Sequence, residues 1–552
     1  MRRGQQMRLL FALAFASLPL LTPCGSAQVA EQERAPATTG DYHIAGTVVD
    51  AKSGNPLARA RVQIRDAKNR QHTQSVISSD DGQFEFRVGA GKFGLEAAKR
   101  GYIAAGYNQH DQFATAIVTG AGLDAEHLVL RISPAATLTG KVLDEHGEPV
   151  RNASVAVYRE DRYSGMSRIR RMRFVQTDDQ GAYEAAGLDE GTYFVSVQAA
   201  PWYAVHPQSA REGSASAPPQ IDSSLDVAYP ITYYGDATEA DEAAPIPVRG
   251  GDRLEADVHL NPAPALHLLF HVPEDGTHGV SFPSIEQPAF DETEALLNRH
   301  VQQFAPGEFE ITGIAAGRYL LRMPDADGQL QAPMAVDLAD SQELTGASGS
   351  STSKVTFTVQ VEGASLPPQI RIGLRNSKGR VVTSQADTKG EVSFSDVIPG
   401  KYDVLAGSPN AVYSVVGMTT EQGTVKGRTL GVPAGASLAV SLSLMGGSVT
   451  VEGFAKRAGK AAAGAMIVLV PNNSELNHDR FRRDQSDLDG SFALYDVAPG
   501  KYTVIAVEDG WDLDWAKPAV LAHYIGHGQA LTVEPHASGT QRLSNPVEVE
   551  PK

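Results

Sequence analysis

Two pairs of residues in this 552-residue sequence have the spacing of metal ligands. His271 and Glu274 form a His-x-x-Glu pair, and His523 and His527 lie four residues apart. A zinc hydrolase would also need a distant third ligand and a catalytic glutamate. His271 ends an alternating run and Glu274 belongs to a Pro-Glu-Asp-Gly turn, while the second pair lacks the glutamate of a His-Glu-x-x-His site. We therefore predict a non-catalytic protein without a metal site or a cofactor.

Other chemistries are excluded by missing motifs and by charge. The sequence contains neither a Gly-x-Ser-x-Gly elbow nor a phosphate-binding Gly-x-x-x-x-Gly-Lys-Ser/Thr loop. Its formal net charge of −17 argues against a duplex nucleic-acid partner, because such a partner requires a basic face that displaces counterions.

Aromatic residues recur at equivalent places. Trp202 follows Tyr193 by nine residues, and Trp511 follows Tyr502 by the same interval. Flat aromatic rings on loops could stack on sugar rings, but they could equally pack each loop back onto its own domain. Both interpretations stay open at this point. The candidate ligand-binding residues are Trp202, Tyr233, Tyr234, Trp511 and Trp515.

Two arginine pairs also recur. Arg171 and Arg173 precede Gly181 at the distances by which Arg480 and Arg482 precede Gly490. Residues spaced by two point to one face of a strand. Such a face could bind an acidic partner or a polymer that carries carboxylates. The alternative is a solvated strand face that pairs with local Asp and Glu residues.

A repeat organises the elements that must position these residues. Five turn segments share a glycine that is followed two residues later by an aromatic or apolar residue, and a second glycine and an aromatic residue come about ten residues further on. Five such matches indicate internal repetition. The turn segments are Asp81–Phe84, Gln180–Tyr183, Pro306–Phe309, Lys389–Val392 and Asp489–Phe492.

The repeat has the pattern of β-hairpins. Ser491–Val497 alternates between apolar and polar residues, Ala498–Lys501 provides a turn, and Tyr502–Val507 forms the next alternating run. Six or seven short strands in each stretch of about 100 residues are typical of a β-sandwich. We also predict one short helix, Asp291–Phe304, with Leu296, Leu297 and Val301 on its apolar side.

The order G-x-V-x-D, G-x-P, A-x-V-x-[VI], D-x-x-G-x-[FY] and G-x-[YF] resembles the carboxypeptidase regulatory-like domain. The copies that begin at Ile44 and Leu138 match best. The resemblance implies an all-β chain, a tandem array of about five Greek-key, transthyretin-like sandwiches. No motif in it is catalytic, and in peptidases this domain lies beside the catalytic domain. Because relatives of the fold often bind sugars, the resemblance makes carbohydrate the first candidate ligand.

The repeat sets the expected domain boundaries. They are a signal peptide (1–27), a polar leader (28–40), sandwich 1 (41–133), sandwich 2 with a long loop (134–264), a degenerate sandwich 3 (265–344), a linker (345–353), sandwich 4 (354–445) and sandwich 5 (446–552).

The N-terminus resembles an export signal. Arg2, Arg3 and Arg8 precede an apolar run over Leu9–Leu21, and small residues stand before a cut after Ala27. Lipid anchoring at Cys24, the only cysteine, is not favoured, because the residues before it fit that processing poorly. The mature chain should lack a transmembrane segment and lie in the periplasm, at the cell surface or outside the cell.

These observations predict an exported, non-catalytic array of binding modules that recognises a polysaccharide. The alternative is an envelope scaffold that binds other proteins. A protein associated with a metallopeptidase is a remote third class.

Overall fold

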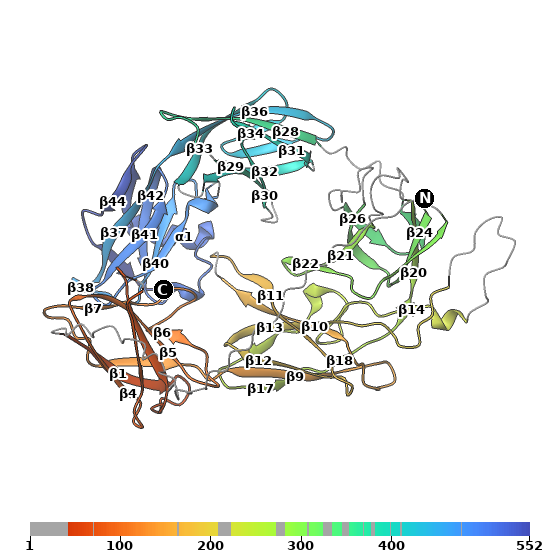
Figure 1. Cartoon of the computed structure of the whole chain (residues 1–552), viewed down its shortest axis with the longest axis horizontal. Helices are drawn as coiled ribbons and strands as arrows, with labels where there is room; N and C mark the ends of the chain where they lie inside the picture. Colours follow the sequence, from red (N-terminus) through yellow and green to blue (C-terminus); the bar gives the residue numbers. More distant parts are fainter. Residues whose placement is uncertain are drawn as a thin grey trace, which may run out of the picture. The chain divides into compact units, whose positions relative to one another are not determined.

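The computed structural model describes residues 42–552, apart from residues 70, 163–164, 208–221, 272–281, 306–307, 324–333, 345–352, 368, 377–380, 398, 409–410 and 476. Its regular structure is almost entirely β-strand, and the described residues contain one α-helix, α1 (Pro518–Tyr524). The chain from residue 40 onward forms one compact unit. Its strands fall into five successive groups, which we call the first to fifth modules (Figure 1). The prediction of an all-β chain of tandem β-sandwiches is confirmed.

The first two modules supply the first nineteen strands. The first module consists of β1 (Tyr42–Asp50), β2 (Arg61–Asp66), β3 (Thr73–Ile77), β4 (Gln83–Val88), β5 (Gly91–Ala98), β6 (Ala105–Gly106), β7 (Ile117–Thr119) and β8 (Leu128–Ile132). The second consists of β9 (Ala136–Leu143), β10 (Ser154–Asp161), β11 (Arg168–Gln176), β12 (Ala182–Leu188), β13 (Gly191–Gln198), η1 (Ser223–Leu225), β14 (Val227–Ala228), β15 (Thr232–Tyr233), η2 (Ala240–Glu242), β16 (Ile246–Val248), β17 (Arg253–Glu255), β18 (Val258–His259) and β19 (Ala263–Pro264).

The described residues of the third and fourth modules form strands. The third consists of β20 (Leu266–His271), β21 (Ser284–Ala289), β22 (Glu292–Ala295), β23 (His300–Ala305), β24 (Glu308–Ile314), β25 (Gly317–Arg322), β26 (Met334–Leu338) and β27 (Gln342–Leu344). The fourth consists of β28 (Ser353–Val361), β29 (Arg371–Asn376), β30 (Val381–Gln385), β31 (Glu391–Val397), β32 (Gly400–Ser408), β33 (Ala411–Thr420), β34 (Thr424–Lys426), β35 (Thr429–Val432) and β36 (Ser437–Gly446).

The fifth module carries the α-helix after its long central strands. It consists of β37 (Ser448–Arg457), β38 (Lys460–Ala461), β39 (Met466–Pro471), η3 (His478–Arg480), β40 (Arg482–Gln485), β41 (Ser491–Val497), β42 (Gly500–Val507), η4 (Gly510–Asp512), α1, η5 (Ile525–His527), β43 (Gln529–Val533), β44 (Ser538–Arg542) and β45 (Val547–Glu550).

All five modules repeat one strand arrangement. The first strand of each module runs antiparallel to the strand after the repeated turn and parallel to a late strand, as β1 does with β4 and β8. In the second layer a central antiparallel pair, such as β2 and β5, has a further strand on each side. The third module forms two four-stranded sheets in this arrangement, although it keeps few of the repeated residues.

Alternation along the strands places the core between the two layers. In β4 the side chains of Phe84, Phe86 and Val88 are buried while their neighbours are exposed. They pack against Ile64 from the second layer and Leu130 from β8. A period of two therefore buries one face of each sheet, as the sequence pattern indicates.

The glycine of the repeated turn is held against the first strand of its module. Gly181 has a φ of 70°, its N–H donates to the Asp178 carbonyl (3.1 Å), and its carbonyl accepts from the Val142 N–H (2.9 Å). A Cβ at Gly181 would lie 2.6 Å from the Val142 carbonyl oxygen, so a side chain does not fit. Glycines with the same φ and the same two hydrogen bonds are Gly82, Gly390 and Gly490.

The second half of the motif is a buried tyrosine with a bonded hydroxyl. Tyr193, Tyr319 and Tyr502 each donate to the carbonyl four residues upstream, at 2.9, 2.6 and 2.7 Å. The hydrogen bond closes the hairpin loop and satisfies a polar atom that burial would otherwise leave unpaired.

A third recurring contact is not visible in the motif. The hydroxyls of Ser78, Thr177 and Ser486, each just before the turn, donate to a carbonyl (2.7, 2.7 and 2.6 Å) and accept an N–H (2.9, 2.8 and 2.9 Å). Their partners lie in the loop that follows the first strand of the module, so these hydroxyls fasten that loop to the turn.

The predicted helix over residues 291–304 is wrong. The segment forms β22 and β23, which pair with β21 and β24. Leu297 and Val301, assigned to an apolar helix face, are 51% and 37% exposed. Hydrogen bonds to neighbouring strands therefore override the helical spacing of three apolar residues. The helix instead begins with Pro518, whose fixed φ suits a first helical position.

The docked turn gives a stability prediction. Gly181→Ala should destabilise the second module by about 2–4 kcal/mol, because a left-handed backbone and a carbonyl clash are combined. Gly147→Ala is the matched control, since Gly147 has a φ of 78° with open space around it, and should cost about 1 kcal/mol. Hydrogen exchange at the Val142 amide in the full chain measures the effect. Equal exchange rates of the Val142 amide in both variants would contradict the proposed contact between the turn and the first strand.

Candidate functional site

The matching arginines hold a strand bulge in place. Arg482 donates to the carbonyls of Tyr495 (3.1 Å) and Asp496 (3.1 and 2.8 Å) in β41, and Arg173 donates to the Ala186 carbonyl in β12. The residues at the two bulges, Gly187 and Asp496, have positive φ values of 75° and 53°. The equal spacing of these arginines thus follows from one structural role.

The other two predicted arginines contact neighbouring modules. An Arg171 nitrogen lies 3.6 Å from a Glu294 carboxylate oxygen of the third module, and Arg480 lies 3.5 Å from the Val415 carbonyl of the fourth. The structure therefore places an acidic partner for Arg171 inside the same chain. Binding of an external acidic partner to these residues stays a prediction.

Trp511 and Trp515 are packed rather than presented to solvent. They are 9% and 5% exposed. His110 of the first module stacks on Trp511 with a centroid distance of 4.9 Å and an interplanar angle of 4°. The Arg483 guanidinium lies 4.7 Å from the Phe113 ring centroid, 5.4 Å from that of Trp511 and 5.3 Å from that of Trp515. We call these five residues the aromatic junction.

Polar contacts surround the aromatic junction and join the first and fifth modules. Arg483 pairs with Asp111 (2.9 Å), and an Asp487 oxygen accepts the Ala116 N–H (3.0 Å). Lys92 of β5 also pairs with Asp487, while burial raises the pKa of that carboxyl. In the second and fourth modules the equivalent aspartates accept N–H groups of their own turns. In the fifth, Asp489 bonds the turn instead (3.0 Å from the Ser491 nitrogen).

The second module also reaches the aromatic junction. The Ala516 N–H donates to the Gly165 carbonyl (3.0 Å), and a Cβ on Gly165 would lie 2.6 Å from the Trp515 ring. Met166 packs against the same cluster. A glycine is therefore required where the second module meets the indole.

Trp202 has the opposite environment. It is 83% exposed, and its ring meets the Tyr203 ring edge-on with a centroid distance of 5.8 Å and an angle of 88°. Tyr203 and Tyr229 donate to the two oxygens of Glu145, the second at 2.8 Å. Burial and Glu145 raise the pKa of Tyr203 to about 12. The exposed Trp202 indole therefore packs against Tyr203, whose position is fixed by its hydrogen bond to Glu145.

The remaining predicted aromatics lie deeper. Tyr233 is fully buried and contacts the Phe290 ring of the third module with a centroid distance of 5.6 Å. Tyr234 is half-buried and packs against the hydrophobic core of the second module. Of the five predicted ligand-binding residues, Trp202 is the one whose ring is mostly exposed, and ligand binding by any of them stays a prediction.

The histidine candidates have ordinary partners. His271 lies 3.5 Å from Glu308, and Glu274 lies outside the described residues. His523 contacts the Ala519 carbonyl of α1 (2.9 Å), and His527 lies 3.3 Å from Glu550.

One acidic group has ligand atoms close enough for a metal ion. In Asp144, Glu145 and His146 these atoms lie within 4.8 Å of one another. Asp144 already accepts the N–H groups of His146 (2.9 Å) and Glu148 (2.8 Å), and both Glu145 oxygens accept from tyrosines. These bonds account for the grouping without an ion.

The second and third modules share a polar seam. Glu294 of β22, which is 3% exposed, accepts hydrogen bonds from Tyr158 and from Gln198 (2.9 Å). His267 bridges Asp226 (2.7 Å) of the second module and Glu310 (2.8 Å) of β24. The Glu310 hydrogen bond, with help from Asp226, raises the pKa of His267 to about 9.

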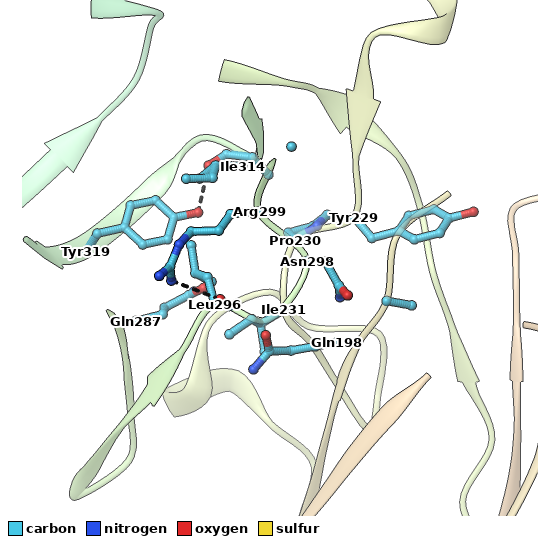
Figure 2. Close-up of a pocket in the computed structure, with 13 residues that line it drawn as sticks. Gln198, Tyr229, Pro230, Ile231, Gln287, Leu296, Asn298, Arg299, Ile314 and Tyr319 are labelled. Atoms are coloured by element: carbon cyan, nitrogen blue, oxygen red, sulfur yellow. Dashed lines mark hydrogen bonds between the residues drawn. The ribbon is translucent and has the colours of Figure 1, made fainter. Parts of the chain in front are cut away.

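Two cavities open along this seam. The one in Figure 2 is lined by Gln198, Gln287, Arg299 and Tyr319 among others, and Arg299 donates to the Leu296 carbonyl (3.2 Å). Its volume of about 20 Å³ has room for about one water molecule. The neighbouring groove, which we call the seam groove, also touches Gln287 and Tyr319 and measures about 840 Å³. That volume suits a bound ligand.

The seam groove was not predicted from the sequence. Its lining comes from Ile169 and Phe194 of the second module and from Phe290 and Leu320 of the third, which are separated by more than 90 residues. The hydrophobic pattern of the sequence indicates only whether each of these residues lies in a strand or a turn, and not that they meet in space. A hint was the group of Asp and Glu residues around Phe290 over 286–294.

The family resemblance is confirmed in the first two modules. The carboxypeptidase regulatory-like domain matches residues 43–119 and 137–216. The chain thus carries two such domains, and the match includes no peptidase domain. No curated protein matches the chain.

Solved structures to which the chain is similar include two bacterial pilins. The Bacillus anthracis TIE protein is 11% identical, with 73% of this chain and 74% of that chain covered and a TM-score of 0.17. GBS52, the minor pilin of Streptococcus agalactiae, is 12% identical over 43% of this chain and 100% of its own (TM-score 0.20). BcpA, the major pilin subunit of Bacillus cereus, is 9% identical over 56% and 99% (TM-score 0.13). Scores this low support no functional inference.

Because Trp202 is exposed and Trp511 and Trp515 are buried, the three indoles should differ in fluorescence quenching. Acrylamide should strongly quench one of the three indoles in the full chain, and Trp202→Phe should remove that component because the other two are buried. Trp511→Phe is the comparison and should leave the quenchable component in place. An unchanged quenching constant in Trp202→Phe would contradict the assignment.

The seam histidine predicts a pH effect. Its pKa rises from 6.5 to about 9 on folding, so its stabilisation is complete below pH 6.5 and is lost as the pH rises through 9. A shift of this size corresponds to about 3 kcal/mol. The difference in melting temperature between the wild type and His267→Gln should therefore be large at pH 6 and small at pH 10. His127→Gln, at an exposed pair, should change little at either pH. A pH-independent difference for His267→Gln would contradict this.

Proposed function

We propose that the protein is an exported, non-catalytic interaction scaffold. The single observation that carries this proposal is the use of Trp511 and Trp515, whose loop positions suggested a ligand site, for packing between modules. A string of independent sugar-binding modules would keep such rings exposed. Packing of the rings instead favours a preorganised platform on which partners assemble.

Export is part of the proposal. The basic start, the apolar run and the small residues before Ala27 favour a cleaved signal, and they lie outside the described residues. Within the described residues, none of the helices has the length and apolar content that crossing a bilayer requires. The proposed location is the periplasm, the cell surface or the extracellular space.

Carbohydrate binding is the second candidate, and Trp202 favours it. An indole that is 83% exposed and fixed by Tyr203 offers a flat face on which a sugar ring could stack. Under this second candidate, the chain would have one carbohydrate site, on the second module, rather than an array of equivalent sites.

Photo-crosslinking distinguishes the two candidates. With benzoylphenylalanine at position 202 in the exported full chain, the scaffold proposal predicts discrete adducts with envelope proteins. The same substitution at Tyr495, which is 65% exposed on the fifth module, is the matched control and should give no adduct. Absence of protein adducts at both positions would contradict the scaffold.

Glycan binding provides the second half of the test. Saturable binding of a soluble polysaccharide to the purified chain, lost in Trp202→Ala and kept in Tyr495→Ala, would favour the carbohydrate candidate. The scaffold proposal predicts no such Trp202-dependent binding.

A further inference from the structure

Five equivalent edge strands differ in charge and in what covers them. The strand after the first central strand of each second layer is the last strand of its sheet, and these strands are β3, β11, β22, β30 and β40. Three of them carry charged residues and contact a neighbouring module. The Ile169 N–H of β11 donates to Asp291 (2.7 Å), Glu294 of β22 lies beside Arg171, and Arg483 of β40 pairs with Asp111.

The other two edge strands, β3 and β30, contain no charged residue. Their sequences are Thr-Gln-Ser-Val-Ile and Val-Val-Thr-Ser-Gln. Ile77 of β3 is 63% exposed, and Val381 and Val382 of β30 are 43% and 52% exposed. In the described part of the chain no strand pairs with the outer edge of either one. Natural proteins usually protect such edges with charges, because their unpaired backbone groups can pair with another chain.

The hydrogen-bond pattern shows which backbone groups point to the open edges. The Ser78 N–H donates to the Ala60 carbonyl (2.8 Å), and the Ala386 N–H donates to the Ile370 carbonyl (2.9 Å). Antiparallel strands are bonded at every second residue, so the intervening residues direct their N–H and C=O groups away from the partner strand. The intervening residues are Thr73, Ser75 and Ile77 in β3 and Val381, Thr383 and Gln385 in β30.

The two open edges complement each other in one antiparallel register. With Ser75 opposite Thr383, apolar residues stand opposite apolar ones and polar residues opposite polar ones. The residues with outward backbone groups also meet each other, as hydrogen bonding requires. Opposed β-branched side chains stabilise such a pair of strands. The other opposed residues are Ile77 and Val381, Val76 and Val382, Gln74 and Ser384, and Thr73 and Gln385.

Pairing of each strand with its own copy is less complementary. Two β3 strands centred on Ser75 would place Ile77 opposite Thr73, and two β30 strands centred on Thr383 would place Val381 opposite Gln385. Each apolar residue would then face a polar one. The side chains therefore favour β3 with β30.

We propose that β3 of one copy of the chain pairs in this register with β30 of a second copy. Each copy has one strand of each kind, so the contact is heterologous and each added copy brings a new open edge. A pair of five-residue strands is smaller than the interface of a stable dimer, so assembly should increase with protein concentration. This inference goes beyond the proposed scaffold function and does not depend on a partner at Trp202.

Lysine substitutions test the proposal by sedimentation velocity on the purified chain. Ser75→Lys and Thr383→Lys should each abolish the assembly that the wild type shows at high concentration, because each places a charge in the middle of an uncharged strand pair. An equimolar mixture of the two variants should form heterodimers and nothing larger, since one variant keeps β30 and the other keeps β3. The matched control is Thr358→Lys, at an exposed residue of β28, which has a strand on both sides, and it should assemble as the wild type does.

Cysteine substitutions detect the contact even where it is weak. Mild oxidation of a mixture of Ser75→Cys and Thr383→Cys chains should give a disulfide-linked heterodimer, because the Cα atoms of a hydrogen-bonded pair lie about 5.5 Å apart. Neither variant alone should form a linked dimer. Assembly of either lysine variant alone, or absence of the mixed disulfide, would overturn the proposal. Envelope crosslinks at position 202 without self-assembly would leave the scaffold function standing and remove this inference alone.

Discussion

The hydrogen bond between the turn glycine and the first strand is the constraint on which the first, second, fourth and fifth modules depend. Gly181 can donate to Asp178 and accept from Val142 only with a positive φ and without a side chain. This contact joins the turn between β11 and β12 to β9, the first strand of the module, which also pairs with β17. The buried tyrosine then closes the following loop, as Tyr193 does through its hydroxyl. The glycine contact is seen in the first, second, fourth and fifth modules and the tyrosine contact in the second, third and fifth, so two small local contacts recur with the sandwich.

Because these backbone bonds already hold the turn, the aspartate side chain of the turn can bond different partners in different modules. In the second and fourth modules the aspartate of the turn bonds its own backbone, but Asp487 bonds Ala116 of the first module, 371 residues away. Asp489 bonds the local turn instead. The nearby Arg483 lies over the Trp511 ring in the aromatic junction. Removing one partner from such a buried charge cluster typically costs several kcal/mol. Loops of the fifth module therefore contact the first module through Asp487 and Arg483, and the second module through Ala516.

The sequence predicts what is local and misses what depends on distant partners. The glycine and tyrosine of the repeat, the alternation of β4 and the all-β fold follow from short-range spacing. The recurrence of Trp511 is equally visible, but its burial is not, because His110 and Phe113 come from a module hundreds of residues earlier. The helix expected around Leu297 fails for the same reason, since β22 and β23 are specified by strands outside the segment. The seam groove needs two modules and has no sequence signal of its own.

A disulfide between the first and fifth modules tests most directly whether the two modules are in contact. The Leu488 N–H donates to the Ala116 carbonyl at 3.1 Å, so cysteines at these positions should lie within bonding reach. The sequence has only one other cysteine, Cys24, which precedes the predicted cleavage site. Under mild oxidation, Ala116→Cys with Leu488→Cys should form an intramolecular bond, seen as a mobility shift that reduction reverses. Free thiols, or only intermolecular dimers, would contradict the account.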